Sequence, residues 1–215
     1  MLSKTKTWTG LTAIAAATAL AFSAAPAFAE DGPKAVVGES APQFELPDLD
    51  GEHHSLSDYE GQIVVLHWQG IECPWEIDQY QTILSGIYRD YQSHTDDEGN
   101  QRIVFLSINS NHTEPVEAIR EYVEQWDVPY PTLKDEGNEI ADIYGARTTP
   151  HIFIIDEEQT LRYKGHPETT PVALADVGQG EDQYLVDALD ALLAGEEIEV
   201  TDTVSRGCSI KRVSR

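Results

Sequence analysis

The chain has 215 residues, of which 38 are acidic and 14 are lysine or arginine, and its formal net charge is −24. A face that binds nucleic acid needs an excess of basic side chains, so this charge excludes nucleic acid as a partner. The length suits one domain with a full hydrophobic core, and the two cysteines allow at most one disulfide within the chain.

Residues 1–29 are typical of a secretory signal peptide. Two lysines precede an apolar stretch, and the run Ala27-Phe28-Ala29 matches the small-x-small pattern of signal peptidase cleavage. The apolar stretch is short for a membrane span, which disfavours a retained anchor. We expect an exported protein, periplasmic or secreted, with no membrane span after cleavage, a folded domain at 30–195 and a C-terminal tail at 196–215.

The next stretch predicts a hairpin, a buried strand and a helix. An Asp-Gly pair at residues 50–51 separates two short extended segments, which indicates an N-terminal β-hairpin. Residues 63–68 form a nearly continuous apolar run, typical of a strand covered by helices on both faces. From Cys73 to residue 91 apolar residues recur every three or four positions, which predicts an amphipathic helix with Pro74 in its first turn.

The remaining chain alternates strand and helix patterns. The expected strands are 103–108, 131–134, 151–155 and 161–164. The expected helices are one opened around residue 113 with Glu114 and Pro115 in its first turn, one at 139–144 and one at about 183–193. Such alternation indicates an α/β fold with a central mixed sheet and helices on both faces.

Cys73 is the residue at which we expect chemistry. It follows the first buried strand and begins a helix, where unpaired backbone N–H groups and the positive end of the helix dipole favour the reactive thiolate. Glu76 stands one helical turn further on. Its charge disfavours a nearby anion and so opposes the dipole, or its carboxylate could relay a proton.

The opening of the domain resembles the redoxin branch of the thioredoxin fold, the AhpC/TSA or peroxiredoxin-like family. The residues that carry this resemblance are Val37-Gly38-x-x-Ala41-Pro42-x-Phe44 and the run Val64-Val65-Leu66. The resemblance covers residues 36–194 and implies a thioredoxin-like fold. It also implies a cis peptide bond before Pro150, with Thr149 presenting its backbone to a bound thiol partner.

Two departures from the family patterns concern the active cysteine. Glu76 stands where a Cys-x-x-Cys motif has its second cysteine. Gly70 stands three residues before Cys73, where the peroxiredoxin signature has a threonine, so a full peroxidase site cannot be carried over.

The chain is most similar to a side group of this family with a single Cys-Pro-aromatic motif and a C-terminal Gly-Cys-Ser-Ile-Lys motif. Here these are Cys73-Pro74-Trp75 and residues 207–211. The second motif lies outside the conserved fold, in a tail with no apolar periodicity, and a cysteine in a mobile tail can approach an active-site thiol, as a resolving cysteine must; Cys208 is therefore our candidate for resolving Cys73. The alternatives are a purely structural disulfide between the two cysteines and two thiols that never meet.

The function we expect is that of an exported thiol-disulfide oxidoreductase or peroxiredoxin-like antioxidant protein. Its partners would be a protein disulfide or small thiol, with peroxide as a further candidate, and an external reductant would restore the thiols. We expect no cofactor and no metal, because four-ligand zinc spacing is not visible. His151 is a candidate for tuning the thiol, and Trp75 for lining a groove. The rival hypothesis is a non-catalytic binding or assembly module of the same fold with a structural disulfide.

Overall fold

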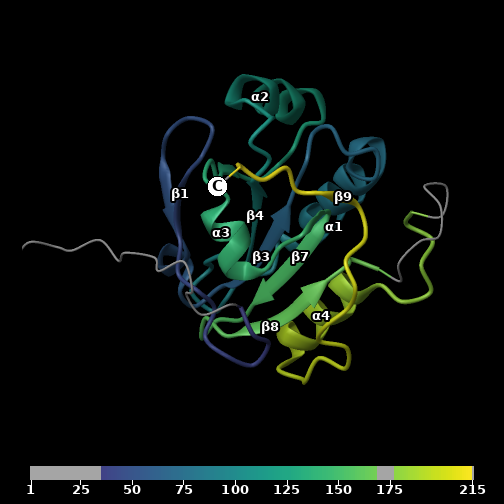
Figure 1. Ribbon diagram of the computed structural model, residues 1–215. Helices are drawn as coiled ribbons and strands as arrows, with labels where there is room; N and C mark the ends of the chain where they lie inside the picture. The colour runs from purple at the N-terminus through teal and green to yellow at the C-terminus, as the bar shows by residue number, and fades with distance from the viewer. Residues whose placement is uncertain (1–34, 169–176, 215) are drawn as a thin grey trace, which may run out of the picture. The chain divides into compact units, whose positions relative to one another are not determined.

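The computed structural model describes residues 35–168 and 177–214, and the predicted signal peptide lies outside them. Its centre is a five-stranded sheet (Figure 1). In spatial order the strands are β5 (Thr132–Lys134), β4 (Ile103–Asn109), β3 (Ile63–Trp68), β7 (His151–Ile155) and β8 (Leu161–Gly165). Within the described ranges, no helix combines the length and the apolar composition that crossing a bilayer requires.

The pairing of β3 determines where the site forms. All six residues of β3 are buried, and the strand pairs parallel with β4 and antiparallel with β7, so the sheet is mixed as predicted. The register places Trp68 opposite Ile108 on one side and His151 on the other. The loop that follows β3 therefore lies beside the start of β7. Because Cys73 is on this loop and Pro150 directly precedes β7, the two residues come together.

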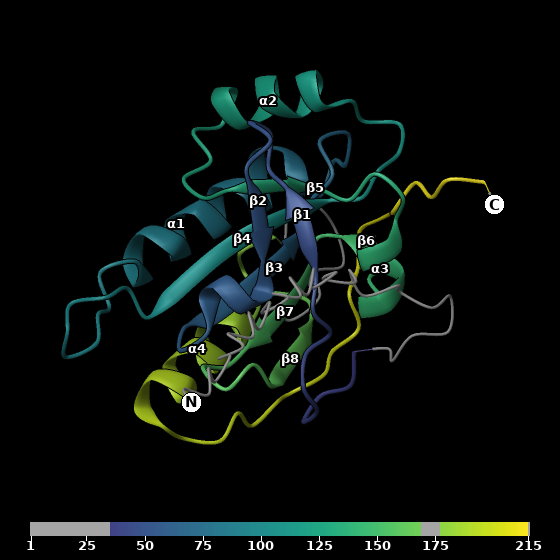
Figure 2. The same ribbon diagram turned by 90° about the vertical axis from the view of Figure 1, so that its left-hand side faces the viewer.

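Helices cover both faces of the sheet (Figure 2). The α-helices in the described part of the chain are α1 (Gln81–Tyr91), α2 (Val116–Gln125), α3 (Glu139–Tyr144) and α4 (Tyr184–Ala194). The side chains of β3 alternate, as strand geometry requires. Val64, Leu66 and Trp68 pack in the same core cluster as α3, whereas Ile63 and Val65 pack with α1 and α4.

Two smaller sheets flank the central one. The predicted hairpin is present, and its strands are β1 (Glu45–Pro47) and β2 (His53–Ser55), followed by a 3₁₀ turn at Leu56–Tyr59. A second pair joins β6 (Thr148–Thr149) to β9 (Cys208–Ser209). This pair carries the tail of the chain to the residues before the cis-proline.

The structure differs from the sequence prediction at the ends of two helices. The helix after Cys73 begins with a π-helical segment, Glu76–Tyr80, before α1. The expected helix start near residue 113 is wrong, because Pro115 has an extended backbone and α2 begins at Val116. Glu114 is therefore not a first-turn residue, and its side chain is buried.

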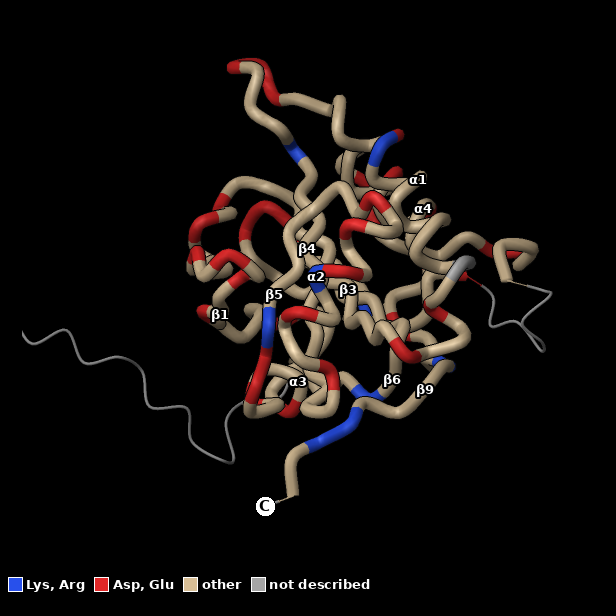
Figure 3. Tube along the Cα trace, turned by 90° about the horizontal axis from the view of Figure 1, so that it is seen from above, with Lys and Arg blue, Asp and Glu red and all other residues tan. Residues whose placement is uncertain are grey.

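Acidic side chains are spread over the elements of the described chain (Figure 3). Several of the basic ones are engaged in ion pairs with them, as in Arg102–Glu157 and Arg162–Asp156. The high negative charge thus belongs to the general surface and bears on solubility and partner choice.

Candidate active site

Cys73 lies where the loop after β3 passes into the helix, and only 2% of its surface is exposed. Its Sγ donates a hydrogen bond to the backbone oxygen of Thr149 at 3.1 Å. The carbonyl of Cys73 accepts the N–H groups of Glu76 and Ile77 at 2.9 and 3.0 Å, so the helical turn starts at the cysteine. The Thr149–Pro150 peptide bond is cis, as the resemblance implies. The thiol therefore faces the backbone of the residue before the cis-proline.

A buried carboxylate holds the loop that leads to this thiol. Glu114 is 2% exposed, and its two oxygens accept the N–H groups of Ile71 at 3.1 Å and Glu72 at 3.3 Å. The side-chain amides of Asn109 and Asn111 donate to the same carboxylate at 2.6 and 2.9 Å. Four donors compensate the burial of the charge, and the backbone before the cysteine is fixed as a result.

Gly70 allows this loop to approach β6 closely. A Cβ at this position would lie 2.8 Å from both Asn111 Nδ2 and Thr149 Oγ1, closer than side-chain atoms pack. The threonine of the peroxiredoxin signature would stand here and has no room. The structure thus gives a steric reason for the departure seen in the sequence.

Cys208 lies directly against Cys73. In the strand pair β6–β9 its backbone is opposite Thr149, the residue whose carbonyl accepts the Cys73 hydrogen bond. The Cys208 thiol lies close enough to Cys73 for each to affect the other, and both cysteines are free thiols. The structure therefore brings the two thiols together.

The surroundings of Cys208 keep its thiol protonated. Burial, the hydrogen bond to Cys73 and the nearby charges of Cys73 and Glu76 raise its pKa from 9.0 to about 12, while Lys211 acts in the opposite direction. A thiol with so high a pKa is a poor nucleophile near neutral pH unless a base removes its proton.

In the structure the tail around Cys208 is docked, with residues 207–213 lying along β6 and α3. The side chain of Ile210 is buried in the core cluster that contains α3, and its N–H donates to the Arg147 carbonyl at 3.0 Å. The backbone N–H groups of Lys211 and Val213 donate to the amide oxygens of Asn111 and Asn138, both at 2.7 Å. Polar partners that sequence periodicity does not reveal thus fix the segment.

Close contact between the tail and β6 depends on Gly207. A Cβ at this residue would lie 2.0 Å from the Thr149 carbonyl oxygen and 2.7 Å from the carbonyl carbon. Both are backbone atoms, so neither can move away easily. The glycine before Cys208 is therefore part of what brings the second thiol to the first.

Glu76 is completely buried beside the two thiols. Its Oε1 is 2.8 Å from Nε2 of His67, whose side chain is also completely buried. His67 is packed in the interior and also contributes a polar contact behind the site.

Trp75 and His151 occupy different positions relative to the thiols. Trp75, within the Cys-Pro-aromatic motif, is partly buried and packs against the core cluster of α1 and α4. The His151 ring packs on Phe153, with centroids 4.5 Å apart, and its Nδ1 accepts the Arg147 N–H at 3.4 Å. Burial and the charge of Arg147 lower the pKa of His151 to about 3, so its imidazole is neutral near pH 7. These contacts lie on the α3 side of the sheet.

Sequence reasoning missed the polar groups that support the site. Glu114 was assigned to a helix turn, and Asn109, Asn111 and Lys134 were not singled out. Lys134 Nζ donates to the carbonyls of Asn111 and Glu114 at 2.7 and 3.1 Å. A signal was present in the sequence, because the run Asn109-Ser110-Asn111 directly follows a buried strand, where polar residues gather at the end of a sheet.

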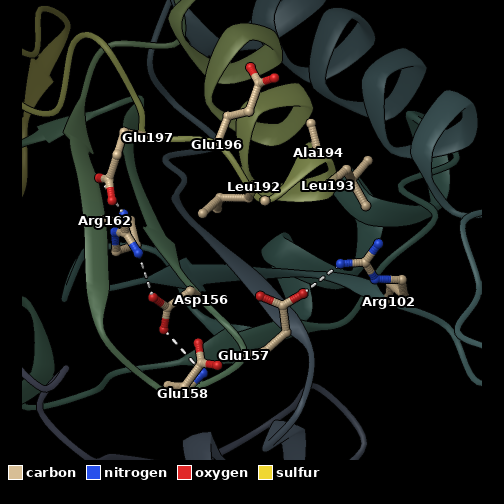
Figure 4. Close-up of a pocket in the computed structure, with 11 residues that line it drawn as sticks. Arg102, Asp156, Glu157, Glu158, Arg162, Leu192, Leu193, Ala194, Glu196 and Glu197 are labelled. Carbon is tan, nitrogen blue, oxygen red and sulfur yellow. Dashed lines mark hydrogen bonds and ion pairs between the residues drawn. The ribbon is translucent and has the colours of Figure 1, made fainter.

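One cavity of about 620 Å³ lies away from the cysteines (Figure 4). It is lined by the turn after β7 and by the C-terminal end of α4, whereas the thiols lie at the start of β7. Charged residues that line the cavity form ion pairs with each other, since Arg162 lies 3.0 Å from Asp156 and 2.9 Å from Glu197. Among the residues that the structure describes, no cluster of three histidine, cysteine or acidic side chains could hold a metal ion.

A mixed sheet with a buried cysteine facing a cis-proline defines a thioredoxin-fold thiol protein. The model of the AhpC/TSA family matches residues 37–164, so the chain belongs to that family. This confirms the resemblance seen in the sequence. Similar solved structures also show the fold, among them a putative protein disulfide isomerase from Bacteroides thetaiotaomicron with a TM-score of 0.55 and 21% identity, covering 74% of this chain and 91% of that one.

Other similar proteins cover more of the chain or carry a described activity. The thiol-disulfide oxidoreductase ResA of Halalkalibacterium halodurans is 29% identical over 130 residues, 60% of this chain and 68% of that protein. ResA of Geobacillus kaustophilus is 30% identical over 128 residues, 59% of this chain and 67% of its own length. A hypothetical protein from Sinorhizobium meliloti 1021 has a TM-score of 0.70 and 28% identity, and the match covers 84% of this chain and 96% of that structure.

Proposed function

We propose that the chain is a thiol-dependent oxidoreductase in which Cys73 is the nucleophile and Cys208 the resolving thiol. The observation that carries this proposal is the position of Cys208 opposite Thr149, the residue before the cis-proline whose carbonyl accepts the Cys73 hydrogen bond. Membership of the AhpC/TSA family and the similarity to ResA proteins support thiol–disulfide chemistry. Residues 1–29, with their signal-peptide pattern, support export to a periplasmic or extracellular space.

The reaction has two steps at sulfur. The Cys73 thiolate attacks one sulfur of a disulfide and expels the other as a thiolate, or attacks a hydroperoxide oxygen, forming a sulfenic acid and releasing an alcohol or water. The Cys208 sulfur then attacks the Cys73 sulfur, forming the Cys73–Cys208 disulfide and expelling the partner thiol or water. An external dithiol reduces this disulfide and restores both thiols.

Turnover by the full chain tests the proposal. With a dithiol as reductant, the wild type should consume hydroperoxide or reduce a protein disulfide. Cys73→Ser should lose at least 95% of the activity, and Cys208→Ser should stop after one chemical event at Cys73 (about a tenfold loss or more). Ser93→Ala, at an exposed position after α1, is the matched polar control. If neither cysteine variant changes either activity, the non-catalytic binding module is the better account.

A further inference from the structure

A carboxylate–imidazole pair lies directly behind the two thiols. Glu76 and His67 each have 0% exposure, and Oε1 and Nε2 are 2.8 Å apart. Glu76 is tied to Cys73 through the first helical turn, in which its N–H donates to the Cys73 carbonyl at 2.9 Å. His67 projects from β3 on the same face of the sheet as α1. The pair is thus held by two rigid elements that meet at the active cysteine.

The polar atoms of Glu76 and His67 lack the hydrogen bonds that a structural ion pair would make. Oε1 and Nε2 are close, but they are not aligned as a hydrogen bond. His67 Nδ1 and Glu76 Oε2 have no hydrogen-bond partner among the described protein groups. Burying polar atoms without partners opposes folding, and such groups concentrate where chemistry needs them. A contribution to stability therefore does not explain why the pair is present.

The resolving step requires a group of this kind. For Cys208 to attack, its proton must leave, and the group expelled from Cys73 must receive one. Glu76 lies in the first helical turn after Cys73, and Cys208 lies opposite Thr149, whose carbonyl accepts the Cys73 hydrogen bond, so the geometry places a buried carboxylate next to the pair of sulfurs that must join. In a Cys-x-x-Cys motif, position 76 would carry the resolving cysteine itself. Here the resolving thiol comes from the tail, and position 76 carries a carboxylate.

Other titratable or charged groups around the pair do not offer an equivalent base. Those whose charges interact with Glu76 or Cys208 are Cys73, Tyr80, Tyr130 and Lys211. Burial raises the pKa of Tyr80 and of Tyr130, so both phenols stay protonated, and Lys211 is a cation. Glu76 is the carboxylate among these groups.

We propose, on the basis of the function proposed above, that Glu76 is the general base of the resolving step and that His67 is its positioning residue. As the Cys208 sulfur forms its bond to Cys73, the Glu76 carboxylate accepts the Cys208 proton. The S–O bond of the Cys73 sulfenic acid breaks, and its electron pair leaves with hydroxide. Glu76 then protonates this hydroxide to water, so the carboxylate is regenerated. With a mixed disulfide, the S–S bond breaks and the departing thiolate receives the proton in the same way.

Glu76→Gln tests this assignment, because base catalysis and a purely electrostatic role predict opposite changes in the rate of resolution. The full reduced chain is treated with one equivalent of hydrogen peroxide, and mass spectrometry follows the Cys73 sulfenic acid and its conversion to the disulfide. We expect sulfenic acid formation within about threefold of wild type and disulfide formation at least tenfold slower. A purely electrostatic role predicts the reverse, because removing the charge lowers the Cys208 pKa and accelerates resolution. Resolution as fast as or faster than in the wild type overturns the assignment.

Three further variants separate base catalysis from structural damage. Glu76→Asp keeps a carboxylate and should recover part of the rate, and His67→Gln should slow resolution less than Glu76→Gln. Glu72→Gln removes an exposed carboxylate next to Cys73 and should leave resolution unchanged. Equal slowing in Glu72→Gln, or no recovery in a folded Glu76→Asp, contradicts the proposal.

A second readout keeps this test independent of peroxide activity. Cys73 is loaded with 5-thio-2-nitrobenzoate, and Cys208 releases the coloured thiolate, which leaves without needing a proton. Glu76→Gln should slow this release at least tenfold at pH 7, with a smaller effect as the pH approaches the Cys208 pKa. If peroxide oxidises no variant but release still slows, peroxide chemistry fails while the base assignment stands. Unchanged release contradicts the assignment even if the wild type turns over peroxide.

Discussion

At the scale of single residues, the contrast between the two cysteines is central. Cys73 is buried at the start of a helix with its sulfur on a backbone carbonyl, and Cys208 lies next to it on the docked tail. Both side chains can therefore take part in one exchange reaction, but the proton on Cys208 is firmly held. The two cysteines have different proposed roles, and measuring thiol reactivity against pH can distinguish them.

The raised pKa of Cys208 predicts slow alkylation in the reduced folded chain. A shift from 9.0 to about 12 lowers the thiolate population on the order of a thousandfold near pH 8, so iodoacetamide should modify Cys208 about 10² to 10³ times more slowly than in the unfolded chain. The rate should still rise above pH 10. Because the folded state holds this proton more tightly, its stabilising contribution is present below pH 9 and is lost between pH 9 and 12.

Site-resolved mass spectrometry measures this rate. Cys73→Ser should bring the Cys208 profile partly back toward the ordinary thiol pKa, because the hydrogen bond and the neighbouring charge are removed while burial remains. A Cys208 rate that levels off below pH 9 in the wild type is inconsistent with the geometry described here.

Glu114 gives a stability prediction at the same scale. Glu114→Ala leaves four donors around an emptied buried position, including the N–H groups of Ile71 and Glu72. Since a lost buried charged hydrogen bond costs about 1.5–3 kcal/mol, the free energy of unfolding should fall by about 2–4 kcal/mol in urea titrations. Glu117→Ala, on the exposed surface of α2, should change it by less than about 0.5 kcal/mol. A Glu114 effect no larger than this control would argue against the buried network.

At the scale of elements, the site is a junction of three segments. The loop after β3 supplies Cys73, the turn before β7 supplies the cis-proline, and β9 supplies Cys208. The docked tail also occupies the β6 edge that the family resemblance assigns to a bound thiol partner. A protein partner that bound to this backbone would have to displace the tail, which would link the reactivity of Cys73 toward proteins to release of the tail.

Gly207→Ala tests whether the tail must dock against β6. The added methyl group would lie 2.0 Å from the Thr149 carbonyl oxygen, so it should displace β9 and separate the thiols. We expect disulfide formation between Cys73 and Cys208 to slow at least tenfold, with faster alkylation of Cys208, as measured by mass spectrometry. The control is Gly86→Ala within α1, where a Cβ meets nothing within 4 Å and alanine favours the helix. Equal disulfide rates in both variants would show that docking is not needed.

At the scale of the whole molecule, much of the fold is predictable from the sequence. The apolar run at residues 63–68 and the three-four spacing after Cys73 define a strand and a helix whose burial patterns match the structure. The hairpin and the antiparallel pairing of β7 with β8 also follow from local patterns. These features depend on short-range periodicity, which a single sequence records directly.

The parts that were not predicted depend on contacts between distant residues. Glu114 looks like a helix-start acid, yet it turns inward because Ile71 and Glu72 present donors from a loop more than forty positions away. The tail shows no apolar period, yet Asn111 and Asn138 bind its backbone. The π-helical turn that carries Glu76 also gives no signal in the apolar spacing. Side-chain partners of this kind become visible only when the chain is folded.

The formation of the Cys73–Cys208 disulfide tests the central claim most directly. The reduced full chain is treated with one equivalent of hydrogen peroxide or of a protein disulfide, and digestion under acid quench followed by mass spectrometry maps the linked peptides. The account predicts an intramolecular Cys73–Cys208 disulfide in the wild type, and in Cys208→Ser a sulfenic acid or mixed disulfide trapped on Cys73. Two cysteines that remain free, or oxidation that begins on Cys208 while Cys73 stays reduced, would contradict it.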